Sequence, residues 1–141
     1  SVVPENNKFN KHKWTNFDYI VGGAPLLVYK GKKITSYSKE IRNSAFIDKQ
    51  HARTAVGILS NKNLVFVVVE ENPILDLKGM SIPELADFMY NLNCDYALNL
   101  DGGGSTSLYL NKGEHTAFNK APDLSLLQLR PVTDAILVLR K

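Results

Sequence analysis

Apolar and β-branched residues occur in short runs separated by turn-forming residues, a pattern that predicts a chain rich in β-strands. Gly31 divides the first two runs and predicts a hairpin, and Asn61 and Asn63 predict a turn between two later runs. A polar stretch over residues 38–52 predicts a surface loop. The expected strands are residues 24–29, 34–37, 54–59, 64–70, 96–100, 106–110 and 132–139.

Residues 82–92 have the clearest helical pattern in the chain. Ser81 and Glu84 are spaced as a capping box, and Pro83 lies in the first turn, where its missing N–H costs little. Since a strand is expected on either side of this helix, we expect a crossover that joins two parallel, adjacent strands. The stripe of the helix expected to be buried consists of Leu85, Phe88, Met89 and Leu92.

Together these elements predict an α+β fold, with a mixed β-sheet, a strand-helix-strand crossover and one main helix packed on one face. The runs fit roughly five to seven strands, a common sheet size. Residues 64–69 are apolar at every position, so we expect a central strand covered on both sides. The side chains expected to be buried in adjacent parallel strands are Val65, Val67, Val69, Leu98 and Leu100.

Length and composition fit one domain. The chain has 141 residues, which we divide into a polar N-terminal arm over residues 1–18 and a domain over residues 19–141. A formal charge of +3, with both signs mixed along the chain, predicts no nucleic-acid partner. No apolar run approaches the roughly 20 residues of a membrane span. The single cysteine, Cys94, excludes an internal disulfide and a cysteine-based zinc cage, and we expect it to pack as a small hydrophobic residue.

Asp101 and the three consecutive glycines after it form the most informative stretch, at the end of an expected strand. Glycine costs roughly 0.5–1 kcal/mol in a regular element, so three in a row indicate a conformation or a close approach that a Cβ atom would block. With the hydroxyls of Ser105 and Thr106, this stretch would place a nest of N–H groups beside a carboxylate. A flexible hairpin turn is the alternative. A phosphate-binding P-loop is excluded, because neither the required Lys nor a helix follows the glycines.

A second cluster lies where the loop over residues 38–52 enters the next strand. There the Arg53 guanidinium could present a fork of donors to a phosphate or a carboxylate. The alternative is a surface arginine paired with an acidic residue. His51, two positions earlier, is a weaker candidate, because a lone histidine is more often structural than catalytic.

Taken together, these motifs resemble the phosphodiester glycosidase family over roughly residues 20–139. In family order, the motifs are Ala52-Arg53-Thr54-Ala55-Val56-Gly57, Gly79-Met80-Ser81 with Glu84-Leu85-Ala86, Ala97-Leu98-Asn99-Leu100-Asp101-Gly102-Gly103-Gly104-Ser105 and Arg130-Pro131-Val132. Two features depart from the family pattern. Glu70-Glu71-Asn72 stands in place of an Asp-Gly-Arg-like triplet, and this chain lacks the N-terminal half with an Asn-Gly-Gly-Phe-type motif. The chain therefore resembles the C-terminal half of the family domain, or a short version of it.

The resemblance implies a hydrolase that cleaves a sugar-1-phosphodiester bond in a glycan, an exopolysaccharide or another cell-envelope polymer. That reaction needs a carboxylate for water or oxocarbenium charge and a cation for the phosphate, roles that we assign to Asp101 and Arg53 as catalytic residues. The expected substrate-binding residues are Thr54, Asn99, Gly102, Gly103, Gly104, Ser105, Thr106 and His51.

Two alternatives remain open at this stage. One is a non-catalytic module that binds a glycan or a sugar phosphate. The other is a half-domain that needs a separate N-terminal half, or a second subunit, to complete its site. We expect no cofactor and no metal ligands, with calcium left open, and we favour a secreted or cell-envelope location.

Overall fold

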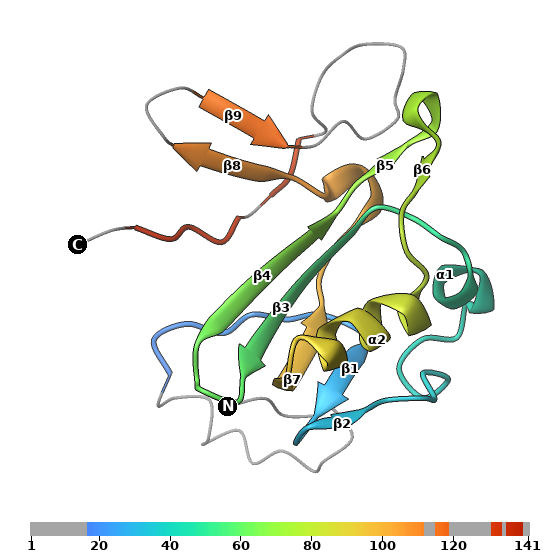
Figure 1. The fold of residues 1–141 in the computed structure, drawn as a ribbon, viewed down its shortest axis with the longest axis vertical. Helices are drawn as coiled ribbons and strands as arrows, with labels where there is room; N and C mark the ends of the chain where they lie inside the picture. Colours follow the sequence, from blue (N-terminus) through green and yellow to red (C-terminus); the bar gives the residue numbers. More distant parts are fainter. Residues whose placement is uncertain (1–16, 112–114, 119–130, 134, 140–141) are drawn as a thin grey trace.

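Five strands form the main sheet, in the order β2-β1-β7-β3-β4, and each pair of neighbours is antiparallel. The computed structural model describes residues 17–111, 115–118, 131–133 and 135–139. Figure 1 shows the sheet with helix α2 lying across it. The strands of this sheet are β1 (Leu26–Tyr29), β2 (Lys32–Lys33), β3 (Arg53–Leu59), β4 (Leu64–Val69) and β7 (Cys94–Asn99).

The smaller elements connect or extend these strands. Two antiparallel ribbons, β5 with β6 and β8 with β9, lie outside the main sheet. These other elements are α1 (Ser44–Asp48), β5 (Glu71–Asn72), the 3₁₀ helix η2 (Pro73–Leu75), β6 (Leu77–Lys78), α2 (Ile82–Asn91), the 3₁₀ helix η3 (Gly103–Ser105), β8 (Leu108–Asn111) and β9 (His115–Phe118). Most of the expected N-terminal arm, and Arg130 of the last family motif, lie outside the described residues.

Helix α2 begins at the predicted capping box. Ser81 Oγ accepts a hydrogen bond from the Glu84 backbone N–H, and the Glu84 carboxylate accepts one from the Ser81 N–H. The buried face consists of Ile82, Leu85, Ala86 and Met89. Phe88 and Leu92, which the predicted stripe included, are 40% and 37% exposed. The buried stripe therefore begins one turn earlier than predicted and is rotated around the helix axis, with Ile82 and Ala86 in place of Phe88 and Leu92.

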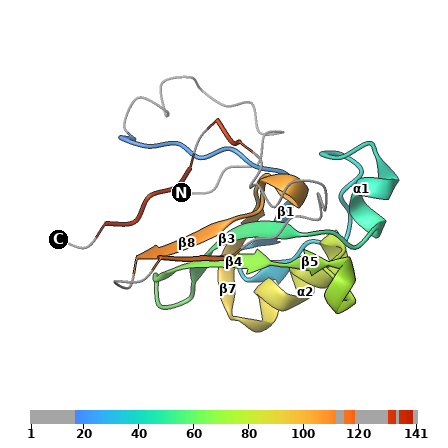
Figure 2. The ribbon, with the colours of Figure 1, turned by 90° about the horizontal axis from the view of Figure 1, so that it is seen from above.

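The core lies between α2 and one face of the sheet, on the side where Figure 2 shows the helix. Leu27 and Val28 of β1 and Ala97 of β7 pack with the buried face of α2. Cys94 belongs to the same cluster and is 2% exposed, so the prediction that it packs as a small hydrophobic residue is confirmed. Burial raises the pKa of its thiol, with a smaller contribution from the charge of Asp95.

The α+β class and the single main helix are confirmed, but the strand order corrects the prediction. β4 and β7 run in the same direction, since each is antiparallel to β3, yet β3 lies between them. The sheet is therefore antiparallel at each pairing rather than mixed. A tight turn follows β3, where Lys62 has a φ of 71° and the Leu59 N–H donates to the Asn63 carbonyl, and it folds β4 back along β3. The other edge of β3 pairs with β7, a contact between segments far apart in the sequence, so β3 separates β4 from β7.

β4 is also not the covered central strand that its sequence predicts. It is an edge strand of the main sheet. On its face away from α2, Leu64 and Phe66 are 62% and 39% exposed. Val65, Val67 and Val69 are partly buried against the core. An apolar run fixes neither the number of neighbouring strands nor the layer that covers each face.

Three segments differ from the expected pattern. The loop over residues 38–52 contains α1, which Asn43 caps by accepting a hydrogen bond from the Ala45 N–H. Residues 34–37 do not extend β2; instead, Tyr37 Oη donates to the Ile34 carbonyl and the chain curls. The described part of residues 132–139 contains no strand, although its pattern is apolar. A β-pattern forms a strand only where a neighbouring edge supplies hydrogen bonds.

Candidate functional site

The candidate site forms where β3 begins and β7 ends. Antiparallel pairing of the two strands, with Ala55 opposite Asn99, brings these two ends to the same edge of the sheet. Beyond the pairing, the Leu100 N–H donates to the Thr54 carbonyl, and the Gly103 N–H donates to the Ala52 carbonyl, each over 2.8 Å. The pairing and these two hydrogen bonds therefore bring the backbones of the two motifs together.

The glycine loop is held closely against the start of β3. A Cβ atom on Gly102 would lie 3.0 Å from the Ala52 carbonyl oxygen, and Gly103 has a φ of +56°, which favours glycine. The close approach that the glycines permit here is thus to the protein's own backbone. Asp101 precedes them on the surface, and its Oδ1 accepts the N–H of Gly102 over 2.9 Å. Gly104 and Ser105 complete the half-buried 3₁₀ helix η3.

Thr54 and Thr106 join the two motifs on the face of the sheet opposite α2. Their hydroxyl oxygens are 3.4 Å apart, within hydrogen-bond distance. Thr106 is fully buried, and its N–H donates to the Gly103 carbonyl. Both residues were predicted to bind substrate. In the structure the backbone of Thr106 is hydrogen-bonded to the loop and its side chain is buried, while Thr54 is half-buried.

Arg53 points to the α2 side of the sheet and is 2% exposed. Its Nε donates to the Met80 carbonyl over 2.9 Å, and its Nη2 donates to the carbonyls of Phe46 and Lys49 over 2.8 and 2.9 Å. The guanidinium also lies 4.8 Å from the centre of the Phe46 ring. These contacts tie α1 and the segment before α2 to the start of β3. The catalytic role assigned to Arg53 stays a prediction.

The electrostatic environment of Arg53 combines two opposing effects. Burial lowers the pKa of the guanidinium, and the negative charge of Glu71 raises it. Arginine starts from such a high pKa that the group stays charged at neutral pH. A buried positive charge therefore lies beside the site. Three carbonyl oxygens accept its hydrogen bonds, and the negative charge of Glu71 stabilises it.

Asn99 is the other buried polar group of the site, at 1% exposure. Its Nδ2 donates to the carbonyls of Ala24 and Leu100 over 2.7 and 2.9 Å, which fixes the orientation of the amide. Its Oδ1 is buried and accepts no hydrogen bond from the described residues. Gly23 packs against the same residue, since a Cβ atom there would lie 2.3 Å from the Asn99 carbonyl oxygen. Asn99 thus fastens the chain before β1 to the end of β7.

Glu71 is the residue of this region that the sequence analysis did not select. It is the first residue of β5, and its Oε2 accepts the N–H of Ala52 over 3.1 Å. The same oxygen lies 3.7 Å from Nδ1 of His51. His51 itself is held by its backbone, which exchanges two hydrogen bonds with Met80. The one available signal was that Glu71 lies within the triplet that departs from the family pattern.

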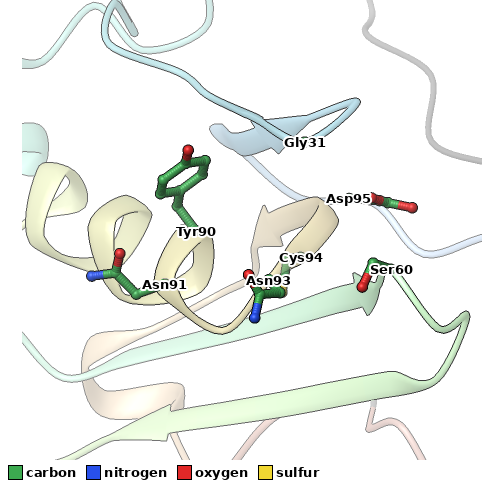
Figure 3. A pocket seen from close by; sticks show the side chains of 7 residues that line it. All are labelled: Gly31, Ser60, Tyr90, Asn91, Asn93, Cys94 and Asp95. Atoms are coloured by element: carbon green, nitrogen blue, oxygen red, sulfur yellow. The ribbon is translucent and has the colours of Figure 1, made fainter.

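A separate cavity lies at the opposite end of the sheet, far along β3 and β7 from the glycine loop. It measures about 320 Å³. Figure 3 shows it between the end of α2, the start of β7 and the turns after β1 and β3. Its lining consists of Gly31, Ser60, Tyr90, Asn91, Asn93, Cys94 and Asp95. It contains none of the predicted site residues, and Asp95 already pairs with Lys62 over 2.8 Å. The motif-bearing end of the sheet is therefore the candidate site.

Among the described residues, no three His, Cys, Asp or Glu side chains are grouped so that they could hold a metal ion. Within that same part of the chain, no helix is long and apolar enough to cross a membrane. The chemistry available at the site is thus that of an exposed carboxylate, a tightly packed glycine loop and a buried cation.

Comparison with known proteins identifies the family of this chain. The sequence profile of the phosphodiester glycosidase family matches residues 2–139. The chain therefore belongs to the phosphodiester glycosidase family, as the motifs around Arg53 and Asp101 predicted.

Two relatives whose names state no activity match part of the chain. An uncharacterized protein of Rickettsia conorii is 33% identical over 84 residues, which cover 57% of this chain and 28% of the relative. A hypothetical protein from Synechocystis is 33% identical with a TM-score of 0.59, over 72% of this chain and 18% of the other.

The third relative has a named activity. The catalytic domain of zebrafish N-acetylglucosamine-1-phosphodiester alpha-N-acetylglucosaminidase, auto-inhibited by its pro-peptide, is 31% identical with a TM-score of 0.53. The match covers 68% of this chain and 33% of that structure. The chain spans a third or less of the length of each of these three relatives.

Proposed function

We propose that this protein is a hydrolase that cleaves a sugar-1-phosphodiester bond in a glycan or a cell-envelope polymer. The family supports a glycosidase-like hydrolase. The zebrafish relative, whose name states a sugar-1-phosphodiester as its substrate, supports the finer substrate class. A polymer of the cell envelope would fit a secreted or envelope location.

The observation that carries the proposal is the fixed position of Asp101. Leu100, the residue before Asp101, donates its N–H to the Thr54 carbonyl, and Gly103, two residues after Asp101, donates its N–H to the Ala52 carbonyl. Between these two anchors, the carboxylate is exposed and can face a substrate. A rigidly placed carboxylate can activate a water molecule or stabilise an oxocarbenium-like transition state.

The remaining roles follow from the same chemistry. A phosphate monoester is already a good leaving group, so the sugar phosphodiester needs less acid assistance than an ordinary glycoside. The positive charge of Arg53 would favour the phosphate electrostatically, while its donors hold the carbonyls around it. Gly104, Ser105 and His51 lie around the same edge of the sheet and would provide polar contacts to sugar hydroxyls.

The second candidate is a module that binds a glycan or a sugar phosphate without turnover. Two observations favour it: Glu70-Glu71-Asn72 departs from the family pattern, and the chain spans a third or less of the length of its relatives. A half-domain that needs a separate N-terminal half would also show no turnover when this chain is assayed alone.

The two candidates are separated by a substrate comparison. The purified chain is incubated with N-acetylglucosamine-1-phosphate linked to a methyl group, and with a nitrophenyl glycoside of the same sugar. We expect release of methyl phosphate from the first, and much slower release of nitrophenol from the second. Saturable binding of the phosphodiester by calorimetry without any release would instead select the binding module. Absence of both binding and release would refute the proposal for this chain.

A further inference from the structure

Glu71 contacts the candidate site through one buried backbone group. Its side chain is 24% exposed, and its Oε2 accepts the N–H of Ala52 over 3.1 Å. Ala52 is fully buried. A buried N–H without an acceptor costs free energy comparable to a lost hydrogen bond, so Ala52 depends on this carboxylate.

The local backbone explains why a side chain must supply that acceptor. His51 and Met80 exchange both of their backbone hydrogen bonds in an isolated antiparallel bridge. Gly79 makes this bridge possible, because a Cβ atom there would lie 2.1 Å from the His51 carbonyl oxygen. Regular pairing with β4 starts only at Arg53, opposite Val69. The N–H of Ala52 therefore falls between two paired regions, and Glu71 accepts it.

The other side of Ala52 contacts the glycine loop. Its carbonyl oxygen accepts the N–H of Gly103 over 2.8 Å. Glu71 is thus connected to the loop that follows Asp101 by two consecutive hydrogen bonds, one on each side of the Ala52 Cα atom. Its charge also acts on Arg53, whose pKa it raises against the lowering effect of burial.

We propose that Glu71 is a positioning residue that holds the strand entry at Ala52 and, through it, the glycine loop that presents Asp101. This inference rests on the proposed function for its catalytic consequence, but its structural consequence is independent of any substrate. The contact of Glu71 is with the Ala52 backbone, so it acts through Ala52.

The structural test is amide hydrogen exchange by NMR, which needs no substrate. Glu71→Met keeps the length of the side chain and removes the acceptor, Glu71→Gln keeps one carbonyl oxygen, and Glu70→Met changes the exposed neighbour. We expect Glu71→Met to speed exchange at Ala52 and at Gly103 by on the order of tenfold. Glu71→Gln should restore both amides, and Glu70→Met should leave them unchanged.

The pattern of exchange decides the inference. Unchanged protection of Gly103 in a folded Glu71→Met protein would overturn it, even if Ala52 loses protection, because the connection between the two would be absent. If Glu71→Met does not fold, Glu71→Asp serves in its place, because the shorter side chain withdraws the acceptor from Ala52. The same two amides then give the answer.

Kinetics on methyl-linked N-acetylglucosamine-1-phosphate provide the functional test. We expect Glu71→Met to lower kcat about tenfold or more with little change in KM, and Glu71→Gln to recover most of that loss. Equal kcat values in wild type and Glu71→Met would overturn the positioning role. An inactive wild type would refute the proposed function alone, since the exchange experiment would still decide whether Glu71 positions the loop.

Discussion

Gly103 donates its N–H to the carbonyl oxygen of Ala52 over 2.8 Å. The two residues lie far apart in the sequence, and this bond joins the glycine loop to the residue before β3. It forms because the antiparallel pairing of β3 with β7 aligns the start of one strand with the end of the other. The most distinctive motifs of the chain therefore share one edge of the sheet.

Gly79→Ala should destabilise the protein strongly. The added Cβ atom would lie 2.1 Å from the His51 carbonyl oxygen, and Gly79 has a φ of +78°. We expect the free energy of unfolding to fall by about 2 kcal/mol or more, measured by urea denaturation. Gly22→Ala is the matched control, because no atom of the described residues lies within 4 Å of its added Cβ. Equal stability of the two variants would contradict the close contact between Gly79 and His51.

Arg53→Lys tests how far the guanidinium stabilises the fold. Lysine keeps the charge but cannot reach the carbonyls of Phe46, Lys49 and Met80 together, as the planar fork of Arg53 does. We expect a loss of about 1–3 kcal/mol in the free energy of unfolding. The exposed Arg42→Lys should change it by less than about 0.5 kcal/mol. A neutral Arg53→Lys would indicate that the arginine is retained for substrate rather than for stability.

Asn99→Asp should be more damaging than its size suggests. The carbonyl oxygens of Ala24 and Leu100 accept hydrogen bonds from the Asn99 side-chain amide. In Asn99→Asp, a buried carboxylate without these donors would face the same two carbonyl oxygens. We expect a loss of about 2 kcal/mol or more at neutral pH, measured by urea denaturation. The control is Asn61→Asp, since Asn61 is exposed and its Oδ1 only accepts the N–H of Asn63. An Asn99→Asp protein as stable as this control would contradict the contacts of Asn99.

Glu84 should make the stability of α2 depend on pH. Hydrogen bonds from the Ser81 backbone and then from its hydroxyl hold the pKa of the Glu84 carboxyl below its ordinary value. A depressed folded pKa gives stability that is present above the unfolded pKa, near 4.3, and is lost as the pH falls through the folded pKa. The stability difference between wild type and Glu84→Gln should therefore shrink on acidification from pH 7 to about pH 3. A difference independent of pH would contradict this assignment.

Local signals explain which parts of the fold were predictable. The capping box of Ser81 and Glu84 fixed the start of α2, and the turn around Lys62 fixed the β3–β4 hairpin. Strand order depends on pairing between distant segments, and the apolar run of β4 carries no information about its neighbour. For that reason, the position of β3 between β4 and β7 could not be read from the sequence.

The site follows the same distinction. Three consecutive glycines after Asp101 are a local signature, so the loop could be found in the sequence. Arg53 could be found as a candidate, but not its burial, because its partners are backbone carbonyls on other elements. For Glu71, the departure from the family triplet was the one signal in the sequence, and it did not reveal the contact with Ala52, which arises from the irregular start of β3.

The most direct test of the central claim is the turnover of methyl-linked N-acetylglucosamine-1-phosphate by wild type and by Asp101→Asn, followed as released methyl phosphate. The substitution removes the charge, but the amide oxygen of the new side chain can still accept the N–H of Gly102 that Asp101 Oδ1 accepts now. Asp95→Asn, at the other end of β7, is the matched control. We predict that Asp101→Asn lowers kcat by at least about 10²-fold, with a thermal midpoint within a few degrees of wild type and Asp95→Asn close to wild-type activity. Undiminished turnover by Asp101→Asn would contradict the assignment of Asp101 as the catalytic carboxylate.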